Sequence, residues 1–190
     1  MTRILLFALL GAEPSWEVHG TTDGVSVFTR SVVGERTAEI KATATTTAAP
    51  QRVCDAAFGA GELDPNEPEV TQRKVVASTV DSRVTYEQIT LPVVSNRDYT
   101  VKTVRQALDH GGCQITFSIA NELGPPVQAG FVRVTKLDGR LTAVPGEDGL
   151  THATYLVFTD PGGAVPAALI EGSRRKAAVK WVKSVLARAK

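Results

Sequence analysis

The stretch TDPGGAVP, residues 159–166, and the run AALIEGSRRKAAVKWVKSVLARAK, residues 167–190, decide the fold of this chain. The second run has helical spacing, with one apolar side made of Ala177, Ala178, Trp181, Val182, Val185, Leu186 and Ala189 and a cationic side made of Lys176, Lys180, Lys183 and Lys190. Proline and glycine in the first run supply a corner, and Pro166 is tolerated in a first helical turn. The pattern predicts a long helix from Ala167 to Lys190 that lays its apolar side on the body. Gly172 and Arg174 interrupt this side, which predicts a bend or a polar contact there.

The chain before this helix reads as short strands separated by turn residues. We expect strands at 25–30, 37–47, 70–79, 83–90, 99–107, 113–120, 131–137, 140–144 and 151–159. Turns are expected at Asp23-Gly24, 33–35, Asp81-Ser82, 109–112, Asp138-Gly139 and 146–149. Such short connections predict antiparallel neighbours. A short helix is expected at 50–59, because Pro50 stands at its start and Gly59 at its end.

These elements predict an α+β fold, in which a curved antiparallel sheet of about nine strands packs on the C-terminal helix. A sheet of this size twists and coils, so that one face becomes a groove. A single helix rarely fills such a groove. The sequence therefore predicts an internal apolar tunnel between the sheet and the helix.

Length and composition indicate one ordinary globular domain, residues 13–190. Hydrophobic residues make up 43% and charged residues 22%, and a net charge of +1 gives no reason to expect a nucleic-acid partner. From Glu171 to Lys190 there are seven Lys or Arg and one acid. This basic end predicts transient contact with a membrane surface, and a solvated helix face is the alternative.

Residues 1–12 have a basic start, an apolar run and small residues at the end, which resembles a short signal peptide. An exported protein, periplasmic or secreted, is expected on that interpretation; if 1–12 are an N-terminal helix instead, the protein is cytoplasmic. The two cysteines, Cys54 and Cys113, form no Cys-x-x-Cys motif and have no cluster of histidines, so no metal site is expected. Export would permit a disulfide, but two free buried thiols are the prediction.

Several motifs resemble those of START domains, the steroidogenic-acute-regulatory-protein-related lipid-transfer family, and of its bacterial members. They are DGVSVFTR at 23–30, LPVVSNRDY at 91–99, Val144-Pro145 and DPGGAVP at 160–166, in the order and rough spacing of that family. The resemblance spans roughly Trp16 to Ala189. The Asn-Arg-Asp-Tyr and Asp-Pro-Gly-Gly elements together are specific to it.

The resemblance implies a helix-grip fold with one lipid or sterol-like molecule in the tunnel, and no enzymatic activity. We expect a monomer with no cofactor. It also implies a gate formed by the C-terminal helix and the loop before Arg97-Asp98. The chain departs from the family at two places. Leu141 or Thr142 replaces a frequent tryptophan, and Thr103 stands where some sterol-binding members have an arginine. Both departures argue against a sterol.

The expected site residues fall into three groups. The tunnel lining is expected at Tyr99, Val101, Thr103, Ile115, Phe117, Ile119, Trp181, Val182 and Val185. The gate is expected at Leu91, Pro92, Val93 and Val94, and the alternative is that these are loop residues packed on the core. Structural motif residues are Arg97, Asp98, Asp160, Pro161, Gly162 and Gly163. Arg97 and Asp98 are neighbours and point to opposite faces of a strand, so each is expected to pair with another group.

Two other functions remain open. An enzyme of the polyketide cyclase or hydrolase kind on the same fold would place His152, Tyr99 or Arg105 in the cavity, and clustered ionisable groups there would favour it. A sensor or interaction module would have a filled tunnel. Common hydrolase, zinc-protease and phosphate-loop motifs are missing from the sequence, and His19, His110 and His152 are expected at surface or structural positions.

Overall fold

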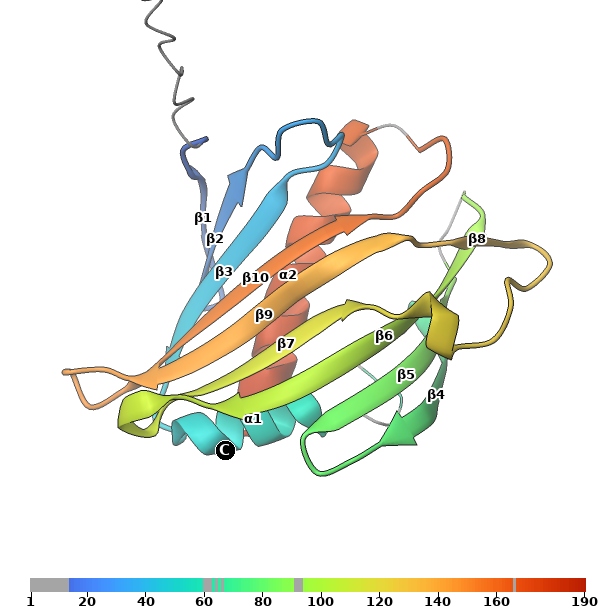
Figure 1. The fold of residues 1–190 in the computed structure, drawn as a ribbon. Coiled ribbons are helices and arrows are strands. Elements are labelled where there is room, and N and C mark those ends of the chain that lie inside the picture. The colour runs from blue at the N-terminus through green and yellow to red at the C-terminus, as the bar shows by residue number, and fades with distance from the viewer. Residues whose placement is uncertain (1–13, 60–62, 64, 66, 91–93, 166) are drawn as a thin grey trace, which may run out of the picture.

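One large sheet forms most of the molecule, and two α-helices lie on one of its faces (Figure 1). The computed structural model describes residues 14–59, 63, 65, 67–90, 94–165 and 167–190. Its strands are β1 (Glu17–Thr22), β2 (Val25–Arg30), β3 (Glu39–Thr46), β4 (Val70–Ser78), β5 (Ser82–Ile89), β6 (Asn96–Ala107), β7 (Cys113–Ile119), β8 (Phe131–Arg133), β9 (Lys136–Pro145) and β10 (Thr151–Asp160). The expected α+β fold, a curved antiparallel sheet against a C-terminal helix, is confirmed.

The strand order across the sheet is β1-β2-β3-β10-β9-β7-β6-β5-β4, and β8 pairs with β6 at the side. The described part of the chain thus has ten strands, one more than the estimate from sequence. Short turns make neighbours antiparallel, as expected, with one exception. β8 runs parallel to the start of β6, where Arg97 lies opposite Val132. Two short 3₁₀ turns, η1 (Asp109–Gly111) and η2 (Asn121–Leu123), follow β6 and β7.

The predicted turn at Asp138-Gly139 is wrong, because both residues lie inside β9. Gly139 is opposite Val157 on one side and Phe117 on the other. A Cβ atom at Gly139 would come within 2.6 Å of the Phe117 ring and 2.2 Å of the Leu156 carbonyl oxygen. The glycine is therefore needed for close approach within the sheet, and its tertiary neighbours override the turn preference of Asp-Gly.

Both helices were predicted close to their observed bounds, α1 (Pro50–Phe58) and α2 (Ala167–Arg188). Pro50 stands at the start of α1, and Gly59 caps its end through a backbone hydrogen bond to Asp55. On α2, the predicted apolar side is buried at Ala178, Val182, Val185 and Ala189 and partly buried at Trp181 and Leu186. Ala177 is exposed, so its assignment to that side was wrong. Within the described residues, neither helix is long and apolar enough to cross a lipid bilayer.

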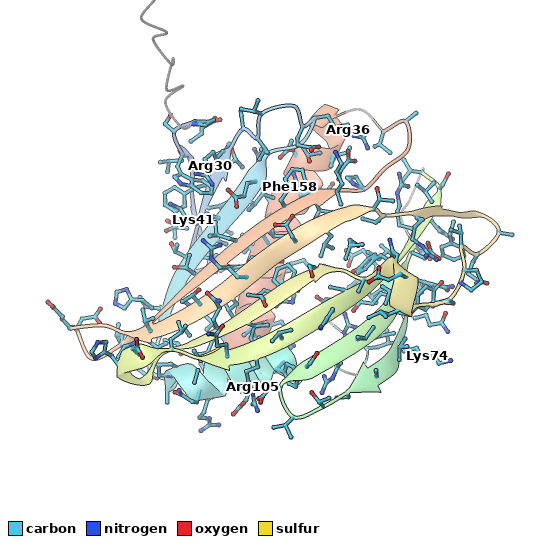
Figure 2. All side chains as sticks on the ribbon, in the orientation of Figure 1. Arg30, Arg36, Lys41, Lys74, Arg105 and Phe158 are labelled. Carbon is cyan, nitrogen blue, oxygen red and sulfur yellow. A yellow bond between two sulfur atoms is a disulfide. The ribbon has the colours of Figure 1, made fainter. Side chains whose placement is uncertain are left out.

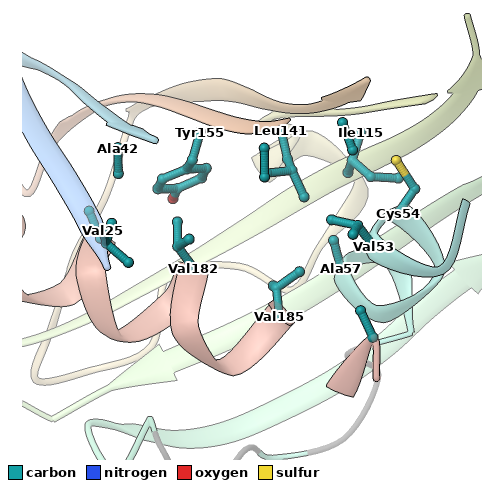
Figure 3. Packing of buried hydrophobic residues seen from close by; sticks show 14 of the residues in the cluster. Val25, Ala42, Val53, Cys54, Ala57, Ile115, Leu141, Tyr155, Val182 and Val185 are labelled. Atoms are coloured by element: carbon teal, nitrogen blue, oxygen red, sulfur yellow. The ribbon is translucent and has the colours of Figure 1, made fainter. Parts of the chain in front are cut away.

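The core lies between the sheet and the helices (Figure 3). Val25, Ala42, Ile115 and Leu141 from the sheet meet Val182 and Val185 of α2, and each is at most 1% exposed. α1 covers the far end of this core with Val53, Cys54 and Ala57.

A disulfide between Cys54 of α1 and Cys113 of β7 closes that end, so the prediction of two free thiols was wrong. The two Cα atoms are 6.3 Å apart, within the range that a disulfide spans. The buried side of α1 lies against β7, and this contact between residues 59 positions apart has no sign in the local sequence.

The other face of the sheet carries charged and aromatic side chains, including Arg30, Lys41 and Phe158 (Figure 2). The Lys41 ammonium lies 4.4 Å from the ring centre of Trp16 and 4.6 Å from that of Phe28. The two tryptophans therefore occupy opposite faces of the sheet, Trp16 here and Trp181 on the face that α2 covers.

Candidate functional site

Strand pairing brings the inward residues of the sheet into rows that face α2. One row runs from Ile115 through Leu141 and Tyr155 to Ala42, across four neighbouring strands. The next row joins Phe117 to Gly139, Val157 and Ile40. Because side chains alternate between faces along a strand, these rows form a continuous apolar surface.

Three aromatic side chains meet between this surface and α2. The ring centres of Tyr155 and Trp181 are 4.3 Å apart in a stacked arrangement. Phe117 lies 5.8 Å from Tyr155 and 6.5 Å from Trp181. We call Phe117, Tyr155 and Trp181 the aromatic cluster. A flat apolar ligand or an acyl chain finds its best packing partners in such a group.

The structure brings five of the nine predicted lining residues into one hydrophobic cluster with this group. They are Ile115, Phe117, Trp181, Val182 and Val185. The other four share the same face of the sheet but lie outside that cluster, with Val101 opposite Ile119 and Thr103 opposite Phe117. The role of all nine residues in lining a tunnel stays a prediction.

Tyr99 belongs to a polar group that the sequence did not predict. Its hydroxyl lies 2.5 Å from Oε2 of Glu87, and Oε1 of Glu87 accepts a hydrogen bond of 2.7 Å from Nε of Arg73. Nη2 of Arg73 donates to Glu67 at 3.0 Å. The side chains of Arg73 and Glu87 are only 6% and 10% exposed. We call Glu67, Arg73, Glu87 and Tyr99 the polar cluster.

Electrostatics couples the members of the polar cluster. Burial acts to lower the pKa of Arg73, but the charges of Glu87 and Glu67 outweigh it and raise the pKa above its ordinary value. Burial raises the pKa of Tyr99 well above its usual value, and the neighbouring charge of Glu87 adds to this. Tyr99 is therefore a neutral hydrogen-bond donor at neutral pH. One signal was available in the sequence, because Arg73 and Glu87 have opposite charges on consecutive expected strands.

The two motif residues Arg97 and Asp98 pair with separate groups, as expected from their opposite directions. Arg97 is 2% exposed and donates to the carbonyl oxygens of Pro161 at 3.3 Å and Gly162 at 3.1 Å, and it also contacts that of Ser95. This arginine therefore ties the Asn-Arg-Asp-Tyr element to the Asp-Pro-Gly-Gly corner.

Asp98 is fully buried and anchors a different segment. Arg133 donates to its two oxygens at 2.8 and 2.9 Å, and the hydroxyl of Tyr86 donates at 3.0 Å. Burial alone would raise the pKa of Asp98, but these hydrogen bonds outweigh burial and hold the pKa below its usual value. Asp98 thus fixes β8 against β6.

Asp160 completes the corner before α2. It accepts hydrogen bonds from Nε of Arg36 at 2.9 and 3.0 Å and from the backbone N–H of Gly162 at 2.8 Å. Arg36 also donates to the carbonyl oxygen of Gly163 at 2.9 Å. Gly162 and Gly163 both have positive φ, of 68° and 69°, which glycine adopts without strain. The corner is thus held by hydrogen bonds from outside it.

The gate prediction is largely untested. Leu91, Pro92 and Val93 lie outside the described residues, as does Pro166 of the corner. Val94 is half-buried. The predicted signal peptide, residues 1–12, also lies outside them.

The structure does not bring His152, Tyr99 and Arg105 together. His152 lies opposite Thr45 and Val144 on the outer face and contacts the exposed Asp148 at 3.1 Å. Arg105 forms ion pairs with Asp55 of α1 and Asp81 of the β4–β5 turn. Among the described residues, no group of three or more His, Cys, Asp or Glu could hold a metal ion.

Within the described residues, two of the hollows on the surface have linings that do not include the aromatic cluster. One, of about 290 Å³, is lined by polar residues of β1, β2 and α2 that include His19, Glu171 and Arg175. The other, of about 450 Å³, lies between α2 and Pro65 and Pro68. Lys180 and Lys183 line it, and they form ion pairs with Glu69 and Asp23. Neither hollow is lined by the predicted tunnel residues.

Comparison with known proteins decides the family. A sequence model described as the START domain matches residues 67–190. The chain belongs to the START domain family. The START fold is typical of proteins that bind lipids or other hydrophobic ligands, and members of the lipid-transfer family are generally not enzymes.

Individual relatives agree with this START assignment. An uncharacterized protein of Pseudomonas aeruginosa is 29% identical over 166 residues, which are 81% of this chain and 76% of the relative. The STAR-related lipid transfer protein of Xanthomonas axonopodis has a TM-score of 0.80 and 22% identity, with 92% of this chain and 98% of that chain covered. Human STARD10 has a TM-score of 0.73 and 21% identity, with 93% and 75% covered. The two solved structures share the helix-grip fold with this START domain.

An enzyme also has a related fold. The aromatase/cyclase ZhuI of Streptomyces sp. R1128 has a TM-score of 0.55 and 14% identity, with 80% of this chain and 92% of that chain covered. At this identity the likeness concerns the fold alone.

Proposed function

We propose that this START domain binds one hydrophobic molecule, a lipid or sterol-like compound, between the concave face of its sheet and α2, without catalysing a reaction. The observation that carries the proposal is the aromatic cluster. Phe117 and Trp181 face each other across the interface between sheet and helix, yet both are only half-buried. If protein atoms surrounded both rings on all sides, the rings would have no accessible surface. Their remaining accessible surface supports the proposal that a ligand has space beside them.

Tyr99, on the same face of the sheet, supports the same space. Burial raises its pKa well above the ordinary value, yet the residue as a whole is only half-buried. Burial of an apolar chain supplies enough free energy for binding, because each buried methylene contributes about 0.8 kcal/mol, and ten contribute about 8 kcal/mol. Polar groups are then needed only for orientation.

The enzyme alternative has one observation in its favour, the buried ionisable groups of the polar cluster. A general base needs an oxygen that is free to accept the substrate proton. Both oxygens of Glu87 are already engaged, Oε1 by Arg73 and Oε2 by Tyr99. This geometry favours a structural role for Glu87, and so it favours the carrier over the enzyme.

Export and transfer between membranes are further parts of the proposal. The Cys54–Cys113 disulfide supports an exported location, since disulfides persist in oxidising compartments. The lysines of α2 would contact a membrane surface. The ion pairs of Lys180 and Lys183 reduce the net charge of that face, so such contact would be weak.

The two tryptophans allow a direct test of ligand position. In a Trp16→Phe variant the remaining indole, Trp181, lies at the proposed site, and in a Trp181→Phe variant the remaining indole lies on the opposite face. Addition of 9,10-dibromostearic acid, whose bromines quench indole fluorescence at contact, should quench Trp181 in the first variant and leave Trp16 in the second largely unchanged. Native mass spectrometry should give one bound molecule per chain. Equal quenching of both indoles, or no quenching of Trp181, would contradict the proposal.

A further inference from the structure

Arg174 is an inward-facing charge on the helix that covers the interior. It stands four residues before Ala178 and seven before Trp181, so all three lie on one side of α2. At 1.5 Å per residue, Arg174 lies about 10 Å along the helix from Trp181. Its side chain is 12% exposed. The polar contact that the sequence predicted near Gly172 and Arg174 is therefore made inside the molecule.

One part of the guanidinium group has a protein partner and another part has none. Nη1 donates to Oε1 of Glu171 at 2.9 Å, and the same oxygen accepts from the backbone N–H of Ala38 at 3.0 Å. Nη2 is buried, and among the residues that the structure describes no oxygen accepts a hydrogen bond from it. A buried N–H group without an acceptor destabilises the folded protein, and more so when the group is charged.

A second donor lies in the same electrostatic environment. Tyr155 of the aromatic cluster is 9% exposed, and in the described part of the chain its hydroxyl makes no hydrogen bond. Burial raises the pKa of Tyr155, Glu67 raises it further, and Arg174 lowers it, so these groups lie within electrostatic reach of one another. Burial lowers the pKa of Arg174, against the opposing effects of Glu171, Tyr155 and Asp160.

The charge of Arg174 is already balanced by Glu171, whereas its hydrogen bonding is incomplete. What is missing is an oxygen that accepts a hydrogen bond, beside rings that accept an apolar chain. We propose that Nη2 of Arg174 binds a carbonyl or carboxylate oxygen of the ligand, whose apolar part lies against Phe117, Tyr155 and Trp181. This inference rests on the proposed function and narrows the ligand class to acyl compounds such as fatty acids and their esters, as opposed to plain hydrocarbons.

Three probes with the same brominated chain test this: 9,10-dibromostearic acid, its methyl ester and 9,10-dibromooctadecane. Their affinities are measured from quenching of Trp181 in the Trp16→Phe protein. In the Arg174→Leu variant, affinity for the acid and the ester should fall at least about tenfold, the loss typical of one hydrogen bond to a charged group. Affinity for the hydrocarbon should stay within about twofold.

Two further variants keep the test interpretable. Arg175→Leu removes the neighbouring arginine, which points to His19 at the surface, and should leave all three affinities unchanged. Glu171→Gln with Arg174→Leu avoids an unpaired carboxylate, and should reproduce the selective loss if Arg174→Leu alone does not fold.

The outcomes separate this inference from the proposed function. Suppose that the Trp16→Phe protein binds all three probes with equal affinity and that both Arg174 variants leave these affinities unchanged. This result would overturn the inference and leave the proposed function standing. Loss of all three affinities together would overturn it as well, because it would indicate a structural role for Arg174. Failure of every probe to quench Trp181 would overturn the proposed function and the inference with it.

Discussion

Asp98 has no exposed surface, yet it carries a charge that three hydrogen bonds from Arg133 and Tyr86 satisfy. A buried carboxylate in this position depends on its arginine. Removal of one member of a buried ion pair typically costs about 3–5 kcal/mol, because the other charge remains without compensation. Within the Asn-Arg-Asp-Tyr element, Asp98 therefore stabilises the folded protein.

We predict that Arg133→Met lowers the free energy of unfolding by about 3–5 kcal/mol, measured by urea denaturation. The variant Asp98→Asn with Arg133→Met should be clearly more stable than Arg133→Met alone, since it removes the unpaired charge. A single variant as stable as the double variant would mean that Asp98 takes up another partner.

Residue-level reasoning from the sequence reached the directions of Arg97 and Asp98 but not their partners. Alternation along a strand requires neighbours to point apart, and that needs no tertiary information. The partners Arg133 and Pro161 are 35 and 64 positions away. Only the assembled sheet brings such positions together. The polar cluster was missed for the same reason, because the contact of Arg73 with Glu87 depends on the register of β4 and β5.

At the scale of elements, α1 and α2 are held to the sheet in different ways. α2 packs through its apolar side, whereas α1 is also joined to β7 by the Cys54–Cys113 disulfide. Apolar periodicity predicted α2, and the end signals Pro50 and Gly59 predicted α1. The disulfide could not be predicted, because the sequence does not say which strand α1 covers.

Reduction of the disulfide should lower the free energy of unfolding by about 4 kcal/mol, the loop-entropy value for cysteines 59 positions apart. Urea denaturation with and without dithiothreitol measures this difference. The variant Cys54→Ala with Cys113→Ala serves as the control, since reductant should leave its stability unchanged. An unaltered protein that is insensitive to reductant would contradict a stabilising role for the bond.

At the scale of the whole molecule, two buried or partly buried carboxylates set the response to acid. Burial opposes the negative charge of Asp98, but Arg133 and Tyr86 lower its pKa overall. The hydrogen bond from Arg36 lowers the pKa of Asp160, against the effect of burial. A carboxyl group with a lowered pKa in the folded state stabilises the protein above its unfolded pKa, about 3.9, and this stabilisation is lost as the pH falls through the folded pKa.

We therefore predict that the melting temperature falls as the pH is lowered below about 4. The variant Asp98→Asn with Arg133→Met should show a shallower fall, because it lacks one of the two groups. Asp138 acts in the opposite direction, since burial and the charge of Glu39 raise its pKa. A fall of equal steepness in both proteins, measured by calorimetry from pH 2 to 7, would exclude Asp98 as a cause.

The global architecture was the most predictable feature of this chain. Turn chemistry and strand alternation predicted nearly all elements, and the motifs predicted the START family. The site was predictable only as a face, because alternation tells which residues point inward but not which of them meet. Arg174 illustrates the limit, since its interruption of the apolar side was visible but its pairing with Glu171 was not.

The corner before α2 has a consequence for folding. Arg97 and Pro161 are 64 positions apart, and Arg36 and Asp160 are 124 apart. Closing long loops costs entropy, so contacts of this kind form only after the intervening strands have paired. If the strands pair in the wrong register, the Arg97 guanidinium is buried without carbonyl oxygens that accept its hydrogen bonds. The Asp-Pro-Gly-Gly corner, by which the family is recognised, therefore also favours the correct strand register. Only the correctly registered sheet provides the buried Arg97 with hydrogen-bond acceptors.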